Sequence, residues 1–431
     1  MKFIQTPVKG MQDFLPLDME LRSHVLSVIR DTYRRYGFSE IETPVMEHIE
    51  NLSGRDGGEN EKLIFKVLKR GRELEKGLKS GELCDSALRY DLTVPLCRYY
   101  SEHKNELPTP FKALQIGNVF RADRPQKGRF RQFTQCDIDI LGDPSAMAEI
   151  ELIGATTTAL SRIFSEVSIS AFTVHLNDRR ILKAMAKKAG FEEKDYDEIF
   201  ILLDKMDKIG EEGVKEELIK AGYDQGAVES YLSGFSLYRE LTEGGVKLNG
   251  DALRDYLEKA CGDTLEKEAS DSLITVMDSS AATIDPSVTL LFDPTLVRGM
   301  SYYTGTIFEI TIDNYSFSIA GGGRYDHMVG RFSGAETPAC GFSIGFERIF
   351  TILRDLRWKA PESGEKKAYL VDLKGASGRI QEVFAHARAE RDQGAVVTVE
   401  PLKKNAKFQI DTLEKSGYTS ILKVYADTKL S

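Results

Sequence analysis

Residues 120–142 read FRADRPQKGRFRQFTQCDIDILG and decide the fold of this chain. The stretches 108–120 and 130–141 predict two strands of a hairpin, because both are rich in apolar and aromatic residues. In the second strand, Cys136, Ile138 and Ile140 alternate with Asp137 and Asp139. A strand turns successive side chains to opposite faces, so the pattern puts the two aspartates on one face.

The polar turn of this hairpin concentrates positive charge. Residues 121–131 hold five cations against the single acid Asp123: Arg121, Arg124, Lys127, Arg129 and Arg131. Planar guanidinium groups suit phosphate oxygens, and the rings of Phe130 and Phe133 can stack on a base. The turn therefore predicts an anion-binding or nucleotide-binding site. The alternative is a solvated hairpin tip whose phenylalanines face the core.

Outward from the hairpin, helix and strand patterns alternate. Spaced apolar residues predict a helix over 17–36, and FSEIETPVME after it predicts a strand interrupted by Pro44. A helix is expected at about 145–165, then the strand SAFTVHL. Residues 178–284 are rich in Lys and Glu with helical spacing and predict a helical insertion. Strand patterns return at VTLLFDPTLV, YYTGTIFEITI and SFSIAGGG, followed by a helix near 345–357.

Beyond a Pro- and Gly-containing linker at 361–367, strands and helices alternate to the end. This order is typical of a small parallel α/β module.

Four further stretches are candidates for chemistry. Arg298 lies between apolar runs ahead of Tyr302 and Tyr303, which favours a cleft or a structural ion pair. Three glycines at 321–323 allow the backbone to approach a ligand closely, or form a plain tight turn. Arg348 stands near a helix start and points to a cleft or to the helix surface. Asp91 and Thr93 suit an ammonium group, or a helix cap.

Composition narrows the classes of protein. The chain has 431 residues, 41% hydrophobic residues, a net charge of −9 and five cysteines without a CxxC pair. No apolar run is long enough for a membrane helix, and no secretory leader is expected. We expect no disulfide framework, and we expect a cytoplasmic location. None of the six histidines has a metal-ligand spacing, so the sequence patterns predict no metal-binding residues.

The order of these motifs resembles the class II aminoacyl-tRNA synthetases, and among them the histidyl-tRNA synthetases. KGMQDFLP with IETPVME is similar to the family's first motif, which builds a dimer interface around a proline, here Pro44. The stretch 120–142 resembles its second motif, and GFSIGFERI its third. LVRGMSYYTGTIFE and AGGGRYD resemble two histidine-specific signatures. The similarity runs from about residue 4 to 357.

The resemblance implies an α+β fold with a class II antiparallel sheet of six or seven strands flanked by helices. The catalytic core then comprises 1–177 and 285–360, with a helical insertion at 178–284. A small C-terminal α/β domain at 366–431 is expected to bind the anticodon, although it is shorter than in the family. A homodimer without membrane attachment is implied.

The implied function is that of a histidine–tRNA ligase. Such an enzyme activates histidine with ATP and Mg²⁺ to histidyl-adenylate and transfers it to the 3′ end of tRNA(His). Arg298 and Arg121 take the catalytic roles at the α-phosphate. Histidine is expected to contact Asp91, Thr93, Arg121, Gln135, Asp139, Arg298, Tyr302 and Tyr303. ATP is expected to contact Arg121, Asp123, Arg129, Phe133 and Arg348.

Two other functions remain open. A non-catalytic paralogue, such as the regulatory subunit of ATP phosphoribosyltransferase, senses histidine without charging tRNA. An RNA-binding relative with a decayed site is the other. The family usually has an aspartate where this chain has Ser301. Against the paralogue, this chain retains the family's motif residues Arg121, Arg298, Gly299, Tyr302, Tyr303 and Arg348.

Overall fold

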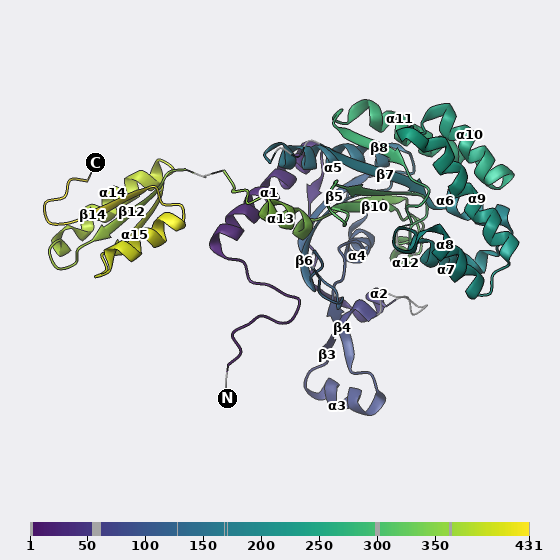
Figure 1. The fold of residues 1–431 in the computed structure, drawn as a ribbon. Coiled ribbons are helices and arrows are strands. Elements are labelled where there is room, and N and C mark those ends of the chain that lie inside the picture. The colour runs from purple at the N-terminus through teal and green to yellow at the C-terminus, as the bar shows by residue number, and fades with distance from the viewer. Residues whose placement is uncertain are drawn as a thin grey trace. The chain divides into compact units, whose positions relative to one another are not determined.

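A computed structural model describes residues 3–53, 62–126, 128–167, 169, 171–297, 302–361 and 364–430 (Figure 1). The chain forms two compact units. The larger comprises Met1–Asp13 with Val25–Trp358, and the smaller comprises Phe14–His24 with Lys359–Ser431. None of the described helices is both long and apolar enough to cross a membrane.

The larger unit is built on an eight-stranded sheet of order β1-β5-β6-β11-β10-β9-β7-β8. In that order the strands are Ser39–Glu40, Phe111–Phe120, Gln132–Leu141, Ala339–Gly345, Ala320–Arg324, Thr306–Thr311, Phe172–Asp178 and Val288–Phe292. The six inner strands are antiparallel, as the class II resemblance implies, while β1 and β8 add parallel edges. The predicted six or seven strands thus become eight.

The central hairpin has the predicted form, with Ile116 opposite Cys136 and Leu114 opposite Ile138. The predicted strand at 38–47 is split into β1 and β2 (Met46–His48), with Pro44 between them. The guanidinium of Arg89 donates to the Thr43 carbonyl at 2.6 Å, next to the proline that has no N–H to offer a ladder. Pro44 thus lies in the segment between the two short strands.

A second sheet of order β2-β4-β3 carries an arm. Strands β3 (Phe65–Leu68) and β4 (Cys84–Leu88) are antiparallel, and helix α3 (Gly71–Ser80) connects them at the far end. In Figure 1 this arm extends below the main sheet, with α3 at its tip. Sequence patterns did not predict α3.

Helices cover the main sheet, and a block of helices follows β7. The first group is α1 (Pro16–Arg35), α2 (Ile49–Leu52), α4 (Thr93–His103), α5 (Met147–Ser165), α12 (Gly330–Ser333) and α13 (Phe346–Asp355). The block is α6 (Arg179–Ala189), α7 (Tyr196–Leu203), α8 (Met206–Lys220), α9 (Gln225–Thr242), α10 (Gly250–Cys261) and α11 (Lys267–Thr283). The predicted helical texture of 178–284 is confirmed, whereas its status as a separate domain remains a proposal.

The smaller unit contains three parallel strands in the order β13-β12-β14. They are β12 (Lys366–Val371), β13 (Val396–Pro401) and β14 (Ser420–Val424), with α14 (Ile380–Asp392) and α15 (Ala406–Lys415) between them. The predicted strand–helix alternation is confirmed. The two helices cross between parallel strands, as parallel pairing requires.

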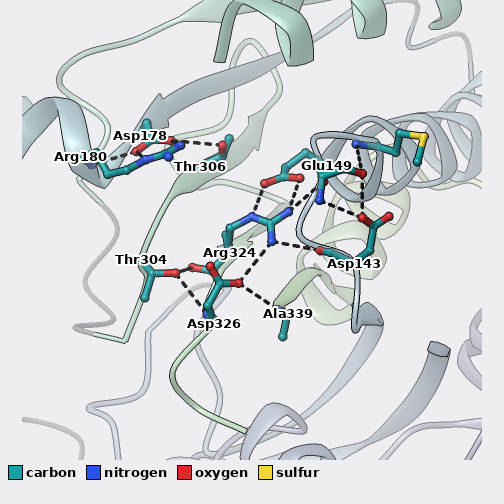
Figure 2. Close-up of polar contacts among 11 residues, drawn as sticks. Asp143, Glu149, Asp178, Arg180, Thr304, Thr306, Arg324, Asp326 and Ala339 are labelled. Carbon is teal, nitrogen blue, oxygen red and sulfur yellow. Dashed lines mark hydrogen bonds and ion pairs between the residues drawn. The ribbon is translucent and has the colours of Figure 1, made fainter. Parts of the chain in front are cut away.

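A buried ion pair holds the glycine-rich strand β10 to helix α5 (Figure 2). Arg324 Nε and Nη2 both donate to the carboxylate of Glu149 at 2.7 Å, and Nη2 also donates to the Ser145 carbonyl at 3.1 Å. Asp326 accepts from Arg324 Nη1 at 3.2 Å. A bidentate pair with its remaining donors satisfied offsets the desolvation of both ions. The end of β10 is therefore fixed, and with it the next residue, Tyr325.

Candidate functional site

A cavity of about 340 Å³ opens where strands β6, β11 and β10 meet the loop after β5, the segment at the start of α4 and the start of α13. It brings together eleven of the twelve predicted site residues. They are Asp91, Thr93, Arg121, Asp123, Arg129, Phe133, Gln135, Asp139, Tyr302, Tyr303 and Arg348. The twelfth, Arg298, lies outside the described residues, as does Ser301. Residues more than 250 positions apart in sequence thus line one space.

Two buried acceptors in this cavity have no partner among the described residues. Asp91 Oδ1 accepts a hydrogen bond from the Val94 N–H at 3.1 Å, while Asp91 Oδ2 accepts none from the described residues. Gln135 donates from Nε2 to Ser343 Oγ at 2.8 Å, while its Oε1 accepts nothing. Burial raises the pKa of the Asp91 carboxyl to about 6. Orphaned buried acceptors are costly, so this wall suits a ligand with several N–H donors.

Asp139 forms a second polar corner of the cavity. The Tyr325 hydroxyl donates to Asp139 Oδ1 at 2.6 Å, and both side chains are buried. Burial raises the pKa of the Asp139 carboxyl to about 7, against the opposing effect of the Tyr325 hydrogen bond. The rings of Tyr302 and Tyr303 lie beside it, 4.9 Å apart between centroids. This corner can accept a hydrogen bond from a small planar polar group.

Asp137 is a cavity residue that the sequence reasoning placed on the Asp139 face but gave no role. It is buried and lines the cavity. Burial and the neighbouring Asp139 raise its pKa well above the ordinary value. The alternation in β6 was the signal that could have included it. Three aspartates, at 91, 137 and 139, line this half of the cavity, so this half favours binding of a cationic group.

Arginines form the opposite, anion-binding half. Arg121 donates from Nε to the Tyr90 carbonyl at 2.9 Å, and its guanidinium carbon lies 5.2 Å from the centroid of the Phe133 ring. Two contacts thus orient the fork before any ligand arrives. Arg129 stands more exposed, 3.7 Å from the Asp123 carboxylate. A site with fixed guanidinium groups suits phosphate oxygens.

Arg348, on the first turn of α13, is oriented in a similar way. It donates to the backbone carbonyl of Ser318 and, at 3.1 Å, to its hydroxyl. Its guanidinium carbon lies 5.8 Å from the centroid of Phe317, a ring that sequence reasoning did not single out. Phe133 and Arg348 both line the cavity and supply flat surfaces that suit an adenine ring.

Glycines make the space between these halves. A Cβ on Gly341 would stand 1.9 Å from Asp139 Oδ1, and one on Gly322 would stand 2.0 Å from the Gly341 carbonyl. Both glycines are therefore required by close approach of strands β10 and β11 and of the Asp139 carboxylate. Within the 321–323 run, Gly322 and Gly323 allow close approach of neighbouring strands, whereas the expected close approach of this backbone to a ligand stays a prediction.

Comparison with known proteins identifies relatives along the whole chain. The sequence family described as "Histidyl-tRNA synthetase" matches residues 10–349. The histidine–tRNA ligase of Leifsonia xyli subsp. xyli is 44% identical over 98% of this chain and 96% of its own length. That of Bacteroides fragilis strain YCH46 is 36% identical over 93% and 90%.

Solved structures agree in fold. The crystal structure of histidyl-tRNA synthetase from Nostoc sp. PCC 7120 has a TM-score of 0.76 at 27% identity, covering 96% of this chain and 90% of that one. A Bacillus halodurans protein described as an ATP phosphoribosyltransferase regulatory subunit/histidyl-tRNA synthetase has a TM-score of 0.75 at 20% identity, covering 98% and 99%. At that identity the second likeness shows the fold alone.

Proposed function

The chain belongs to the histidyl-tRNA synthetase family, and on that premise we propose that it is a histidine–tRNA ligase. The enzyme joins histidine to the adenylyl group of ATP with release of pyrophosphate, and then passes the histidyl group from the adenylate to the 3′ end of tRNA(His). One observation carries the proposal beyond the family likeness. A single cavity joins an acidic half with two orphaned acceptors to a half with pre-oriented arginines.

The reaction needs charge stabilisation and positioning more than covalent catalysis. An oxygen of the histidine carboxylate attacks the α-phosphorus of ATP, a new P–O bond forms, and pyrophosphate leaves. The tRNA terminal hydroxyl then attacks the activated carbonyl and releases AMP. Fixed cations aimed at the developing charge lower the barrier of the first step. Arg121 is such a cation, because its two contacts orient it in advance.

Residue roles follow from the two halves of the cavity. The α-ammonium group of histidine pairs with Asp91, Thr93 and Gln135, where it satisfies Asp91 Oδ2 and Gln135 Oε1. Arg121 and Arg298 neutralise the α-phosphate and the substrate carboxylate. Phe133 and Arg348 hold the adenine between them with help from Asp123, and Arg129 binds the outer phosphates.

Specificity for histidine rests on Asp139 and Tyr303, with Tyr302 lining the space. Asp139 accepts the imidazole N–H with one carboxylate oxygen, while the Tyr325 hydroxyl donates to the other oxygen of Asp139. A pocket built to bond a polar group rejects an apolar side chain of similar size, because buried polar atoms are then left unpaired.

Mg²⁺ is part of the proposal as a companion of ATP. No group of three potential ligands that could cage a metal occurs in the described ranges. The donors fit a different arrangement, since Mg²⁺ is usually held by substrate phosphates, water and one or two carboxylates. Glu347 lines the cavity, its Oε1 accepts the Thr134 N–H at 3.1 Å, and it is the carboxylate that would contact the ion. When bound, the ion would neutralise charge on the outer phosphates.

The proposal includes the setting of the enzyme. We infer a cytoplasmic homodimer whose interface includes the segment around Pro44, and a C-terminal unit at 366–431 that contacts the anticodon. The regulatory paralogue is less favoured, because the cavity keeps the phosphate-directed cations Arg121, Arg129 and Arg348. A histidine sensor has no use for them.

Aminoacylation tests the proposal. The purified chain is incubated with ATP, Mg²⁺, labelled histidine and a tRNA(His) transcript, and the acid-precipitable label is measured. We expect charging that depends on ATP and is lost when the terminal adenosine of the transcript is oxidised with periodate. Histidine binding without charging contradicts the ligase and supports the sensor.

A further inference from the structure

The arm formed by β3, α3 and β4 is strongly basic in an acidic chain. Residues 62–88 read KLIFKVLKRGRELEKGLKSGELCDSAL and hold seven lysines and arginines against four acids, a net charge of +3 where the whole chain carries −9. The structure builds this stretch as a strand, a ten-residue helix and a returning strand. The role proposed above makes no use of the arm.

Three cations on α3 form a stripe. Arg72, Lys76 and Lys79 are exposed and follow one another at spacings of four and three residues, which places them on one side of the helix. Lys76 pairs with Glu73 at 2.6 Å, but both side chains are largely exposed. Such surface pairs contribute little, so Lys76 remains available to a stronger anion.

The base of the arm adjoins the mouth of the cavity. Leu63, just before β3, lines the cavity, and its carbonyl accepts the Ala122 N–H at 2.9 Å. The exposed Lys62 and Lys66 lie on the arm side of this contact. The exposed Arg124 and Arg129 lie on its other side, in the loop between β5 and β6. Figure 1 shows the arm leaving the main sheet beside the lower end of β6. Positive charge therefore continues from the cavity mouth onto the arm.

We propose that this arm binds the phosphate backbone of the tRNA whose 3′ end enters the cavity. The inference rests on the proposed ligase function, which brings a polyanion to this mouth. A duplex RNA presents regularly spaced phosphates, and lysine and arginine contacts to them give sequence-independent affinity. A four-residue strand spans about 13 Å and a ten-residue helix about 15 Å, so the arm extends well beyond the cavity.

Exposed leucines on the arm offer the competing interpretation of a protein interface. Leu78 is 68% exposed and Leu68 is 57% exposed. Leu78 is two residues from Lys76 and so faces away from the cationic stripe. The stripe itself is charged and polar, and protein interface cores are depleted in lysine. RNA is the better fit to the charged side.

The test measures RNA binding directly on the full chain. The triple variant Arg72→Ala/Lys76→Ala/Lys79→Ala is compared with the wild type by fluorescence anisotropy with a labelled tRNA(His) transcript at several salt concentrations. Alanine favours helix, so α3 is expected to persist, and circular dichroism verifies it. We expect the Kd to rise at least tenfold. Each lost phosphate contact also reduces the slope of log Kd against log salt by about 1.

A matched control uses the acids of the same helix. Glu73→Gln/Glu75→Gln removes two negative charges from α3, so the Kd for the transcript is expected to fall rather than rise. Three single alanine variants back up the triple one if it proves unstable, each expected to weaken binding by a smaller factor.

The outcomes separate the arm from the catalytic proposal. An unchanged Kd and salt slope in a folded triple variant overturn the arm proposal. So does an unchanged Kd with an altered mass in sedimentation, which would assign the arm to a contact between protein chains. Histidine-dependent ATP–pyrophosphate exchange is measured in parallel without RNA. Its absence in the wild type overturns the ligase function, whereas the RNA affinities test the arm by themselves.

Discussion

The Tyr325 hydroxyl donates a hydrogen bond of 2.6 Å to Asp139 Oδ1, which links the strand end of AGGGRYD to the polar corner of the cavity. The ion pair between Arg324 and Glu149 fixes the residue before Tyr325, so the hydroxyl has little freedom to move away. Asp139 Oδ1 is thereby held in place, and the proposal assigns the other carboxylate oxygen to the substrate. The proposed selectivity for histidine depends on this support.

Tyr325→Phe is predicted to weaken histidine binding. A hydrogen bond to a charged group is worth about 1.5–3 kcal/mol, so the KM for histidine should rise about 10- to 100-fold. The KM for ATP should change little, since ATP contacts the arginine half. Steady-state exchange kinetics with each substrate varied measure the split. Tyr36→Phe, which removes a 2.8 Å bond to Thr158 between two residues that do not line the cavity, is the control and should leave both values unchanged. Equal rises in the two KM values contradict the role.

Asp139→Asn is predicted to stabilise the free protein at alkaline pH. Burial raises the pKa of this carboxyl from 3.8 to about 7. Between about pH 4 and 7, the folded state therefore keeps a proton that the unfolded state has already released. The carboxyl's favourable contribution is present below pH 4 and is lost as the pH rises through 7. The neutral amide removes that loss, so Tm should increase by a few degrees at pH 8 and hardly at all at pH 4.

Thermal unfolding of both proteins across this pH range measures the effect. A gain in Tm that is the same at pH 4 and pH 8 contradicts a buried carboxyl with a raised pKa. In exchange kinetics, the same variant should raise the KM for histidine far more than that for ATP.

Gly341→Ala is predicted to slow histidine activation strongly. The added Cβ would stand 1.9 Å from Asp139 Oδ1, so the carboxylate has to leave its position. A displaced catalytic or binding group commonly costs about 100-fold in rate. The specificity constant for histidine in exchange should fall by that factor. Gly378→Ala, where an added Cβ meets nothing within 4 Å, is the control and should behave like the wild type. Unchanged kinetics of Gly341→Ala contradict the proposed position of Asp139.

Arg298→Ala is predicted to slow adenylate formation by about 10²–10³, the usual cost of losing one fixed donor to a developing negative charge. The prediction rests on the resemblance and the chemistry of the step, because Arg298 lies outside the described residues. Single-turnover adenylate formation measures it, with circular dichroism to verify folding. Arg298→Lys keeps the charge without the fork and should recover only part of the rate. A fully active alanine variant contradicts the role.

Periodicity predicted the elements that are regular and amphipathic. The alternation of Cys136, Ile138 and Ile140 with aspartates predicted β6, and spaced apolar residues predicted α1 and α5 within a few residues. Helix α3 was missed because Gly71 and Gly77 within it depress its helix propensity. In the segment between β1 and β2, the Thr43 carbonyl accepts from Arg89, 46 residues away, a contact that no local pattern predicts.

The sequence predicted which residues form the site, but it did not predict the contacts that support them. The resemblance named Asp139, but its hydrogen bond to Tyr325 joins residues 186 positions apart. Asp137 acquires its raised pKa only through burial beside Asp139. Phe317 has no distinctive sequence signal, and its packing against Arg348 arises from the fold. Such long-range contacts require the tertiary structure.

Exchange of labelled pyrophosphate into ATP, measured on the purified chain with each of the twenty amino acids and without RNA, tests the central claim most directly. It isolates the activation step from the C-terminal unit and from the arm. The account predicts robust exchange with histidine and none above background with the other amino acids. Histidine binding without any exchange, or equal exchange with several amino acids, would contradict it.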